Sequence, residues 1–165
     1  MSEEQLYHVD RSDRVLGRVS RREAHVRGLL HRAGCVVICH HDGRPFMARR
    51  SMDKAFFPGH WDFPCSFHVA WGESYDEAAK RELREETGIE ASPEPVGGVL
   101  VDETPDHLLV HVYKLVHVGP IRLDPKEAAS GSFVTPAVLE DRLLHEATTS
   151  WFAPAWRLLR RDARQ

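Results

Sequence analysis

Three glutamates near the middle of the chain could together bind a divalent cation. Glu82, Glu85 and Glu86 are spaced three and four residues apart, so on a helix their carboxylates project from one face. Three anions on one face repel one another, and Glu85 and Glu86 also fall in a last helical turn, where the helix dipole disfavours negative charge. A hard cation such as Mg²⁺ would remove both penalties, because it prefers carboxylate oxygens and often completes its coordination with water and substrate phosphates.

A helix over residues 75–87 must position these carboxylates. Ser74 is a suitable N-cap, Glu77 three residues later completes a capping box, and Gly88 supplies a left-handed stop. The same pattern also fits an ordinary solvated helix, in which Arg81 pairs with glutamates one turn before and one turn after it. The residues around the helix are therefore needed to choose between the two interpretations.

The rest of the chain alternates irregularly between predicted strands and helices. A hairpin is expected near the N-terminus, followed by a helix that Ser20 and Glu23 open with a second capping box. Residues 57–62 are expected to form a loop, and Pro93 and Pro95 to mark a connection. The expected strands cover residues 6–9, 15–19, 34–39, 46–50, 99–101, 108–113 and 132–134, and further helices cover residues 20–27, 136–144 and a final segment with Trp156, Leu158 and Leu159. This order predicts an α/β fold with a mixed β-sheet covered by helices on both faces.

Composition and charge restrict the class of protein. The chain has 165 residues, of which 42% are hydrophobic and 28% charged, and this fits one folded domain over residues 1–165. A net charge of −3 gives no reason to expect binding to nucleic acid or a membrane surface, and no apolar run approaches the roughly 20 residues that span a bilayer. A polar start unlike a secretory signal and an odd number of cysteines (Cys35, Cys39 and Cys65) predict a reducing, cytoplasmic location.

The linear pattern from residue 67 to residue 89 resembles the Nudix box, G-x5-E-x7-R-E-U-x-E-E-x-G-U, in which U is aliphatic. Every position but the first matches, through Glu73, Arg81-Glu82-Leu83, Glu85-Glu86 and Gly88-Ile89. The first position, a glycine in the family, is Phe67 here. In the family the peptide near that glycine approaches the metal, so we expect the Phe67 side chain to narrow or reshape the site.

The resemblance implies a single Nudix hydrolase domain with a Nudix-type α/β/α sandwich, acting with Mg²⁺ or Mn²⁺ on a small nucleotide or diphosphate substrate. It also implies roles for the residues of the box: Glu82, Glu85 and Glu86 as metal ligands, Arg81 to hold a glutamate in place, and Glu73 to anchor the loop to the helix.

A second resemblance, over about residues 9–154, is to hydrolases related to isopentenyl-diphosphate isomerase. It rests on the runs VDRSDRVLGRVSRREAHVRGLLHRAGCVV, ARRSMDKAFFPGHWD and GPIRL, in addition to the box. The isomerase shares the Nudix fold but shifts a double bond, using an essential cysteine, a glutamate and a metal held largely by histidines. His25, His31 and His68 fall near those ligand histidines. We nevertheless expect them to be structural or substrate-facing here, because the isomerase set is incomplete.

Two differences from the isomerase favour a hydrolase. Ser66 takes the position of the nucleophilic cysteine, and Cys65 comes one residue early, which in a strand turns the side chain to the other face. The isomerase's acidic pair falls near Asp106 and Leu108, so one carboxylate is missing. The glutamates of the hydrolase box are all present, and the chain is therefore interpreted as a hydrolase with isomerase ancestry.

Charged residues outside the box could contact the substrate. Arg50 and Lys54 align with basic residues that hold the diphosphate in the isomerase, and they could form a phosphate clamp or simply a charged strand end. Glu127 lies where several Nudix hydrolases place another glutamate as ligand or base, although loop carboxylates are usually only solvated. Trp61, Trp71, Phe57 and Phe67 could either stack on a base or pack.

The leading hypothesis is a metal-dependent pyrophosphohydrolase that cleaves a phosphoanhydride bond in a nucleoside di- or triphosphate or a nucleoside diphosphate derivative. Glu85 or Glu127 would take the proton from the attacking water. The alternatives are an isopentenyl-diphosphate isomerase-like enzyme and a non-catalytic nucleotide-binding Nudix module, which Phe67 would suit. The base, the sugar, the number of phosphates and the oligomeric state stay open.

Overall fold

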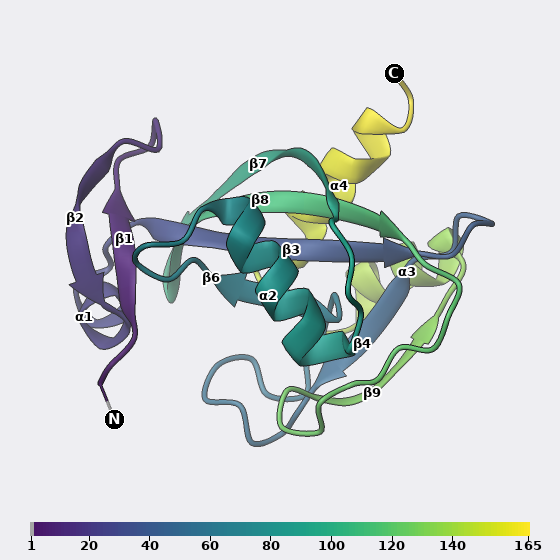
Figure 1. Ribbon diagram of the computed structural model, residues 1–165. Helices are drawn as coiled ribbons and strands as arrows, with labels where there is room; N and C mark the ends of the chain where they lie inside the picture. The colour runs from purple at the N-terminus through teal and green to yellow at the C-terminus, as the bar shows by residue number, and fades with distance from the viewer. Residues whose placement is uncertain (1) are drawn as a thin grey trace.

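The protein, described over residues 2–165 by a computed structural model, contains two β-sheets and four helices (Figure 1). The larger sheet contains β1 (Gln5–Val9), β2 (Val15–Ser20), β3 (His31–Cys39), β6 (Cys65–His68), β7 (Glu94–Glu103) and β8 (Asp106–Val116). The smaller sheet contains β4 (Phe46–Arg50), β5 (Trp61–Asp62) and β9 (Ala128–Phe133). The helices are α1 (Arg21–Arg27), α2 (Tyr75–Thr87), α3 (Pro136–His145) and α4 (Phe152–Asp162).

The larger sheet is mixed, as predicted. Its order is β2-β1-β3-β8-β7, and β6 also pairs with β3. The β3–β8 pair is parallel, whereas β1–β2, β3–β6 and β7–β8 are antiparallel. Helix α2 covers one face of this sheet and α4 lies on the other (Figure 1), which confirms the predicted α/β sandwich.

Both faces of β3 are buried, which explains its continuous apolar sequence. Cys35 and Val37 belong to the core cluster that contains Trp156 of α4, whereas Val36 and Ile38 belong to the cluster that contains Leu83 of α2. All three cysteines are buried and free, so they act as small hydrophobic residues in these cores. The central strand therefore connects the helix that carries the glutamates to the opposite layer.

Several strands are longer than predicted because tertiary pairing extends them, and β3 and β7 show this most clearly. β3 begins at His31 rather than at residue 34, since His31 pairs with both His8 of β1 and Leu108 of β8. β7 covers residues 94–103 rather than 99–101 and contains Pro95, which was expected in a connection. Proline is tolerated there because β7 is an edge strand whose register shifts between Pro95 and Gly97.

Strands around the smaller sheet differ most from the prediction. β9 covers residues 128–133, whereas residues 132–134 were predicted. The prediction missed its first half because the sequence AASGSF lacks the apolar alternation of a strand. Gly131 is required at its centre, since an added Cβ would lie 2.5 Å from the Phe46 ring of β4. The expected loop over residues 57–62 ends in the two-residue β5, and no separate strand was predicted at β6.

Local helix signals were more reliable. α2 covers residues 75–87 as predicted, with both hydrogen bonds of the Ser74–Glu77 capping box and a left-handed Gly88 at φ 73°. In α1 the Ser20 side chain accepts from the Glu23 backbone N–H, but the Glu23 carboxylate pairs with Arg27 instead of completing a box. No helix within residues 2–165 has the length and apolar character needed to cross a membrane.

Phe67, which replaces the first glycine of the box, lies directly opposite Gly34 in the β3–β6 pair. Phe67 is buried, and a Cβ built on Gly34 would lie 2.5 Å from its ring atom Cζ and 3.2 Å from the His111 carbonyl oxygen. The ring therefore occupies the space that a side chain at residue 34 would need. The large residue on β6 and the absence of a side chain on β3 depend on each other.

We expect Gly34→Ala to lower the free energy of unfolding by about 1–3 kcal/mol, the usual cost of overpacking. In a Phe67→Ala background the same substitution should cost much less, because the ring is gone. Urea unfolding of the two single variants and the double variant measures this coupling. Gly17→Ala is the matched control, since nothing lies within 4 Å of a Cβ there. Additive effects of the two substitutions would contradict the packing argument.

Candidate active site

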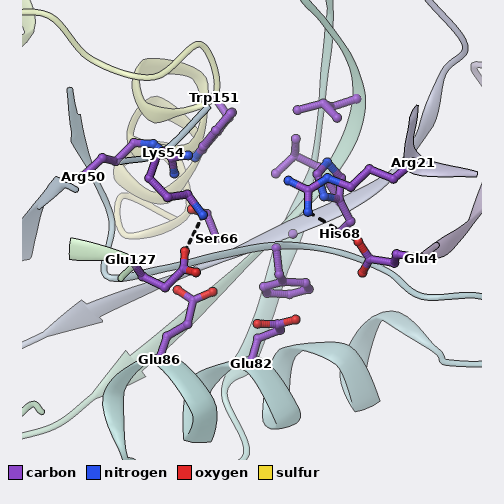
Figure 2. A pocket seen from close by; sticks show the side chains of 15 residues that line it. Glu4, Arg21, Arg50, Lys54, Ser66, His68, Glu82, Glu86, Glu127 and Trp151 are labelled. Atoms are coloured by element: carbon purple, nitrogen blue, oxygen red, sulfur yellow. Dashed lines mark hydrogen bonds and ion pairs between the residues drawn. The ribbon is translucent and has the colours of Figure 1, made fainter. Parts of the chain in front are cut away.

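A pocket of about 180 Å³ lies beside β6 and the carboxylate face of α2 (Figure 2). Its charged residues come from five separate parts of the chain. They are Glu4, Arg21, Arg50, Lys54, Glu82, Glu86 and Glu127, and the remaining lining includes Gly34, Ser66, Phe67, His68, Leu108 and Trp151. Acidic and basic side chains thus face the same cavity.

Helix α2 presents two of its three predicted metal ligands to this pocket. Glu82 and Glu86 line it, and both side chains extend from the helix into the pocket, with the Glu86 carboxylate next to Glu127 (Figure 2). Leu83 and Ala79 are fully buried against the sheet, and this fixes the rotation of the helix. The carboxylate pair is therefore held by a helix with capped ends and a packed inner face.

Glu82 and Glu86 are poorly placed to be ionised together. Burial raises the pKa of the Glu82 carboxyl despite the opposing effect of Arg81. Burial, and then the nearby Glu82 and Glu127 carboxylates, raise the pKa of the Glu86 carboxyl well above its usual range. Oxygen donors crowded in this way, with repulsion that a cation would relieve, fit a hard divalent ion such as Mg²⁺.

Glu85, predicted as a metal ligand and possible base, lies differently from its two neighbours. Its side chain is 53% exposed, compared with 17% for Glu82, and its carboxylate accepts from Arg81 Nη1 at 3.2 Å. At about 100° per residue, Glu86 lies about 40° to one side of Glu82 and Glu85 about 60° to the other. Among the described residues, Glu85 is not part of the pocket lining.

Arg81 joins the helix to the loop before it. Its guanidinium contacts both Glu73 oxygens, at 2.5 Å from Nε and 3.0 Å from Nη2, in a two-pronged ion pair. Its Nη1 also donates to Glu82 at 2.7 Å. Glu73 in turn accepts from the Ala70 backbone N–H at 3.3 Å. Arg81 thus contacts the glutamates of the box, and Glu73 links the loop to the helix, while their roles in an enzyme stay predictions.

The predicted phosphate-binding cations both reach the pocket, and each has an acidic partner. Lys54 Nζ lies 2.6 Å from Glu127 Oε2. Arg50 Nη1 lies 3.3 Å from Asp62, while its Nε and Nη2 donate to the Phe56 carbonyl oxygen at 3.2 and 3.0 Å. The structure therefore brings Arg50, Lys54 and Glu127 to the face opposite Glu82 and Glu86.

Besides Glu4, which also lines the pocket, two charged contributors were missed by sequence reasoning. Arg21, the first residue of α1, lines the pocket and lies 3.5 Å from Glu4 in an ion pair. Asp62, at the end of β5, is 2% exposed and contacts Arg50. No local motif marks either residue, because each meets the site only through the tertiary fold.

Three histidines gather next to the pocket. One ring nitrogen from each of His25, His31 and His68 lies within 4.8 Å of the other two, and His68 lines the pocket. Within residues 2–165, the buried Nε2 atoms of His25 and His31 have no hydrogen-bond partner. Burial lowers the pKa of all three imidazoles, for His31 from 6.5 to about 4. The predicted structural or substrate-facing role is compatible with this placement.

The strand β6 turns Ser66, and not Cys65, towards the cavity. Ser66 lines the pocket and donates to Asp62 at 2.6 Å. Cys65 belongs to the core on the α2 side, where burial raises the pKa of its thiol well above the usual range. Of the other two positions compared with the isomerase, Asp106 is buried and bonded to Ser150, and Leu108 lines the pocket. The one-residue offset thus has the structural effect that strand alternation predicts.

Comparison with known proteins identifies the class to which this fold and site belong. Residues 29–153 match the NUDIX domain, so the chain belongs to the Nudix family. An uncharacterised Nudix hydrolase of Pseudomonas aeruginosa is 34% identical over 147 residues, covering 88% of this chain and 85% of that protein. An isopentenyl-diphosphate Delta-isomerase of Serratia proteamaculans is 33% identical over 157 residues, covering 91% and 88%. The crystal structure of a Deinococcus radiodurans protein superposes with a TM-score of 0.81 and 27% identity, covering 95% of this chain and 98% of that one.

We expect His31 to lower the stability of the metal-free protein as the pH falls from about 6.5 towards about 4, the pKa of His31 in the folded state. The raised pKa values of Glu82, Glu86 and Asp62 act in the opposite direction, so the contribution of His31 is the difference between the wild-type protein and a variant without it. Over that range the unfolded chain binds a proton at His31 that the folded chain excludes, so the free energy of unfolding falls as the pH falls. The shift corresponds to about 3 kcal/mol for this residue. The lowered pKa values of His25 and His68 act in the same direction. Urea unfolding at a series of pH values measures the effect.

Two variants separate this effect from general acid lability. Between pH 6.5 and pH 4, His31→Gln should lose about 3 kcal/mol less stability than the wild-type protein, because the buried titrating group is removed. His41→Gln, at an exposed turn, is the matched control for replacing a histidine. Equal slopes in the two variants would show that His31 is not responsible.

Proposed function

We propose that this protein is a metal-dependent pyrophosphohydrolase that cleaves a phosphoanhydride bond in a nucleoside di- or triphosphate or a nucleoside diphosphate derivative. The observation that carries the proposal is the composition of the pocket. Glu82 and Glu86 supply crowded oxygen donors, and Arg50 and Lys54 supply cations on the facing wall. Cation-binding acids and phosphate-binding bases in one cavity are what a diphosphate substrate with a divalent metal requires.

Glu82 and Glu86 would hold Mg²⁺ or Mn²⁺, and Arg50 and Lys54 would contact phosphate oxygens. The metal would neutralise phosphate charge and lower the pKa of water in the site. Lys54 must exchange its bond to Glu127 for one to phosphate, and this exchange frees the carboxylate of Glu127. Glu127 lines the pocket and Glu85 does not, which favours Glu127 as the general base.

Glu86→Gln should abolish metal-dependent turnover while the metal-free protein stays folded. The substitution removes an oxygen donor, but it also removes a buried charge that Glu82 and Glu127 repel, so the melting temperature at pH 8 should be unchanged or higher. Phosphate or nucleoside monophosphate release from a panel of nucleoside triphosphates, nucleotide sugars and dinucleoside polyphosphates measures turnover. Glu90→Gln, an exposed residue just past α2, is the control. Full activity in Glu86→Gln would remove the metal-site assignment.

Glu127→Gln should lower kcat by about 10²–10⁴-fold, the usual contribution of a general base, and should remove the acidic limb of the pH–rate profile. Glu85→Gln is measured alongside it, because the sequence predicts either Glu85 or Glu127 as the general base. Loss of the acidic limb in Glu85→Gln and its retention in Glu127→Gln would assign the base to Glu85 instead.

An isomerase-like activity on isopentenyl diphosphate is the second candidate, favoured by the cluster of His25, His31 and His68. The buried Cys65 and the pocket-facing Ser66 argue against it, since the thiol does not face the cavity. Incubation with isopentenyl diphosphate distinguishes the two: dimethylallyl diphosphate as product would support the isomerase. Turnover of either kind would exclude a non-catalytic nucleotide-binding module.

A further inference from the structure

Asp62 is a buried carboxylate that accepts hydrogen bonds from five donors. Its Oδ2 accepts from Arg50 Nη1 at 3.3 Å and from Ser66 Oγ at 2.6 Å. Its Oδ1 accepts from the Phe63 backbone N–H at 2.7 Å, from Trp151 Nε1 at 2.8 Å and from Thr149 Oγ1 at 3.3 Å. Burial raises the pKa of the Asp62 carboxyl, and the five donors, which match the ionised form because it only accepts, offset part of that cost.

Three of these five donors line the candidate active site. Arg50 ends β4, Ser66 lies in β6, and Trp151 is the residue before α4. Asp62 itself is 2% exposed and belongs to a small cavity behind the pocket rather than to the pocket. It therefore cannot meet the substrate directly, and any effect it has must act through residues that do.

Arg50 is the donor through which Asp62 can influence a phosphate group bound in the pocket. Asp62 holds its Nη1, and the Phe56 carbonyl oxygen holds its Nε and Nη2, so the plane of the guanidinium is fixed from two sides. The Arg50 Cζ lies 5.7 Å from the centroid of the Trp151 ring, and the indole N–H of Trp151 donates to Asp62. Three of the five guanidinium N–H groups are used in this way, and two remain for a ligand.

We propose that Asp62 is a positioning residue that fixes Arg50, and with it Ser66 and Trp151, in the geometry needed to bind a diphosphate. The inference rests on the proposed function, because it assigns the diphosphate to the wall that contains Arg50. Asp62 orders that wall before the substrate arrives, so Arg50 does not lose conformational freedom on binding.

Asp62→Asn tests this role with little change in shape. The amide oxygen can still accept from Trp151, Thr149 and Phe63, whereas its NH₂ group then faces Arg50 and cannot hold it. Binding of methylenediphosphonate, which is not hydrolysed, is measured by calorimetry with Mg²⁺ present. We expect the affinity to fall by at least about tenfold, the loss expected when one hydrogen bond to a charged group is misplaced.

A double-mutant cycle shows whether the effect passes through Arg50. In an Arg50→Met background, Asp62→Asn should change the affinity by less than about twofold, because the residue it positions is gone. Thr149→Val is the control: it removes a donor to the same carboxylate, but Thr149 does not line the pocket, and affinity should stay within about twofold of the wild-type protein. A merely structural Asp62 would lower the melting temperature without this pattern of non-additive binding.

The outcomes separate this inference from the proposed function. If the wild-type protein does not bind methylenediphosphonate, both fail. If the wild-type protein binds and the folded Asp62→Asn variant binds equally well, the positioning role is wrong but the proposed function stands. The same conclusion follows if the losses of affinity in Asp62→Asn and Arg50→Met add fully in the double variant. If Asp62→Asn does not fold, the Arg50 side-chain N–H resonances of the ligand-free wild-type protein decide. Resolved, slowly exchanging signals support prepositioning, and exchange-averaged signals overturn it.

Discussion

Negative charge on largely buried carboxyl groups is the constraint on which the rest of the structure depends. Burial, and then the nearby Glu82 and Glu127 carboxylates, raise the pKa of Glu86 well above its usual range. Their repulsion opposes folding, and it is offset only in part by Arg81 at Glu82 and by Lys54 at Glu127. Within residues 2–165 no ion pair is formed by Glu86. The chain thus gives up stability at the place where its proposed chemistry needs a cation.

Strand alternation in β6 then determines which residues take part. Ser66 and His68 face the cavity side, whereas Cys65 and Phe67 belong to the core beneath α2. Phe67 also lines the inner end of the pocket, in contact with the bare backbone of Gly34. The replacement of the box glycine is therefore accommodated by a missing side chain on the neighbouring strand.

The parts of this structure that local signals specify were predictable from sequence. The bounds of α2 follow from Ser74, Glu77 and Gly88, which act within one turn of the helix ends. The box glutamates were found, but spacing alone could not show that Glu85 turns away from Glu82 and Glu86, because three and four residues both count as one face. Rotation of the helix is set by packing, which is a tertiary property.

Long-range contacts and edge strands account for the rest. Asp62 meets Thr149 and Trp151, which lie 87 and 89 residues away in the chain, so no motif could have indicated it. The predicted bounds of β9 were wrong because its small residues carry no local strand signal. A small residue is needed there to make room for the Phe46 ring of the neighbouring strand, which the sequence alone does not show. The Pro95 segment was expected as a connection for sound local reasons, and only its edge position makes a strand possible there.

That same edge has a consequence for how the molecule behaves in a crowded solution. A ten-residue edge strand that is paired on one side only, as β7 is with β8, is a template on which another chain could extend the sheet. In β7, however, Pro95 offers no N–H, and the shift in register before Gly97 bends the backbone away from a flat ribbon. The irregularity that made the strand hard to foresee also discourages intermolecular strand addition, and so protects the protein against aggregation.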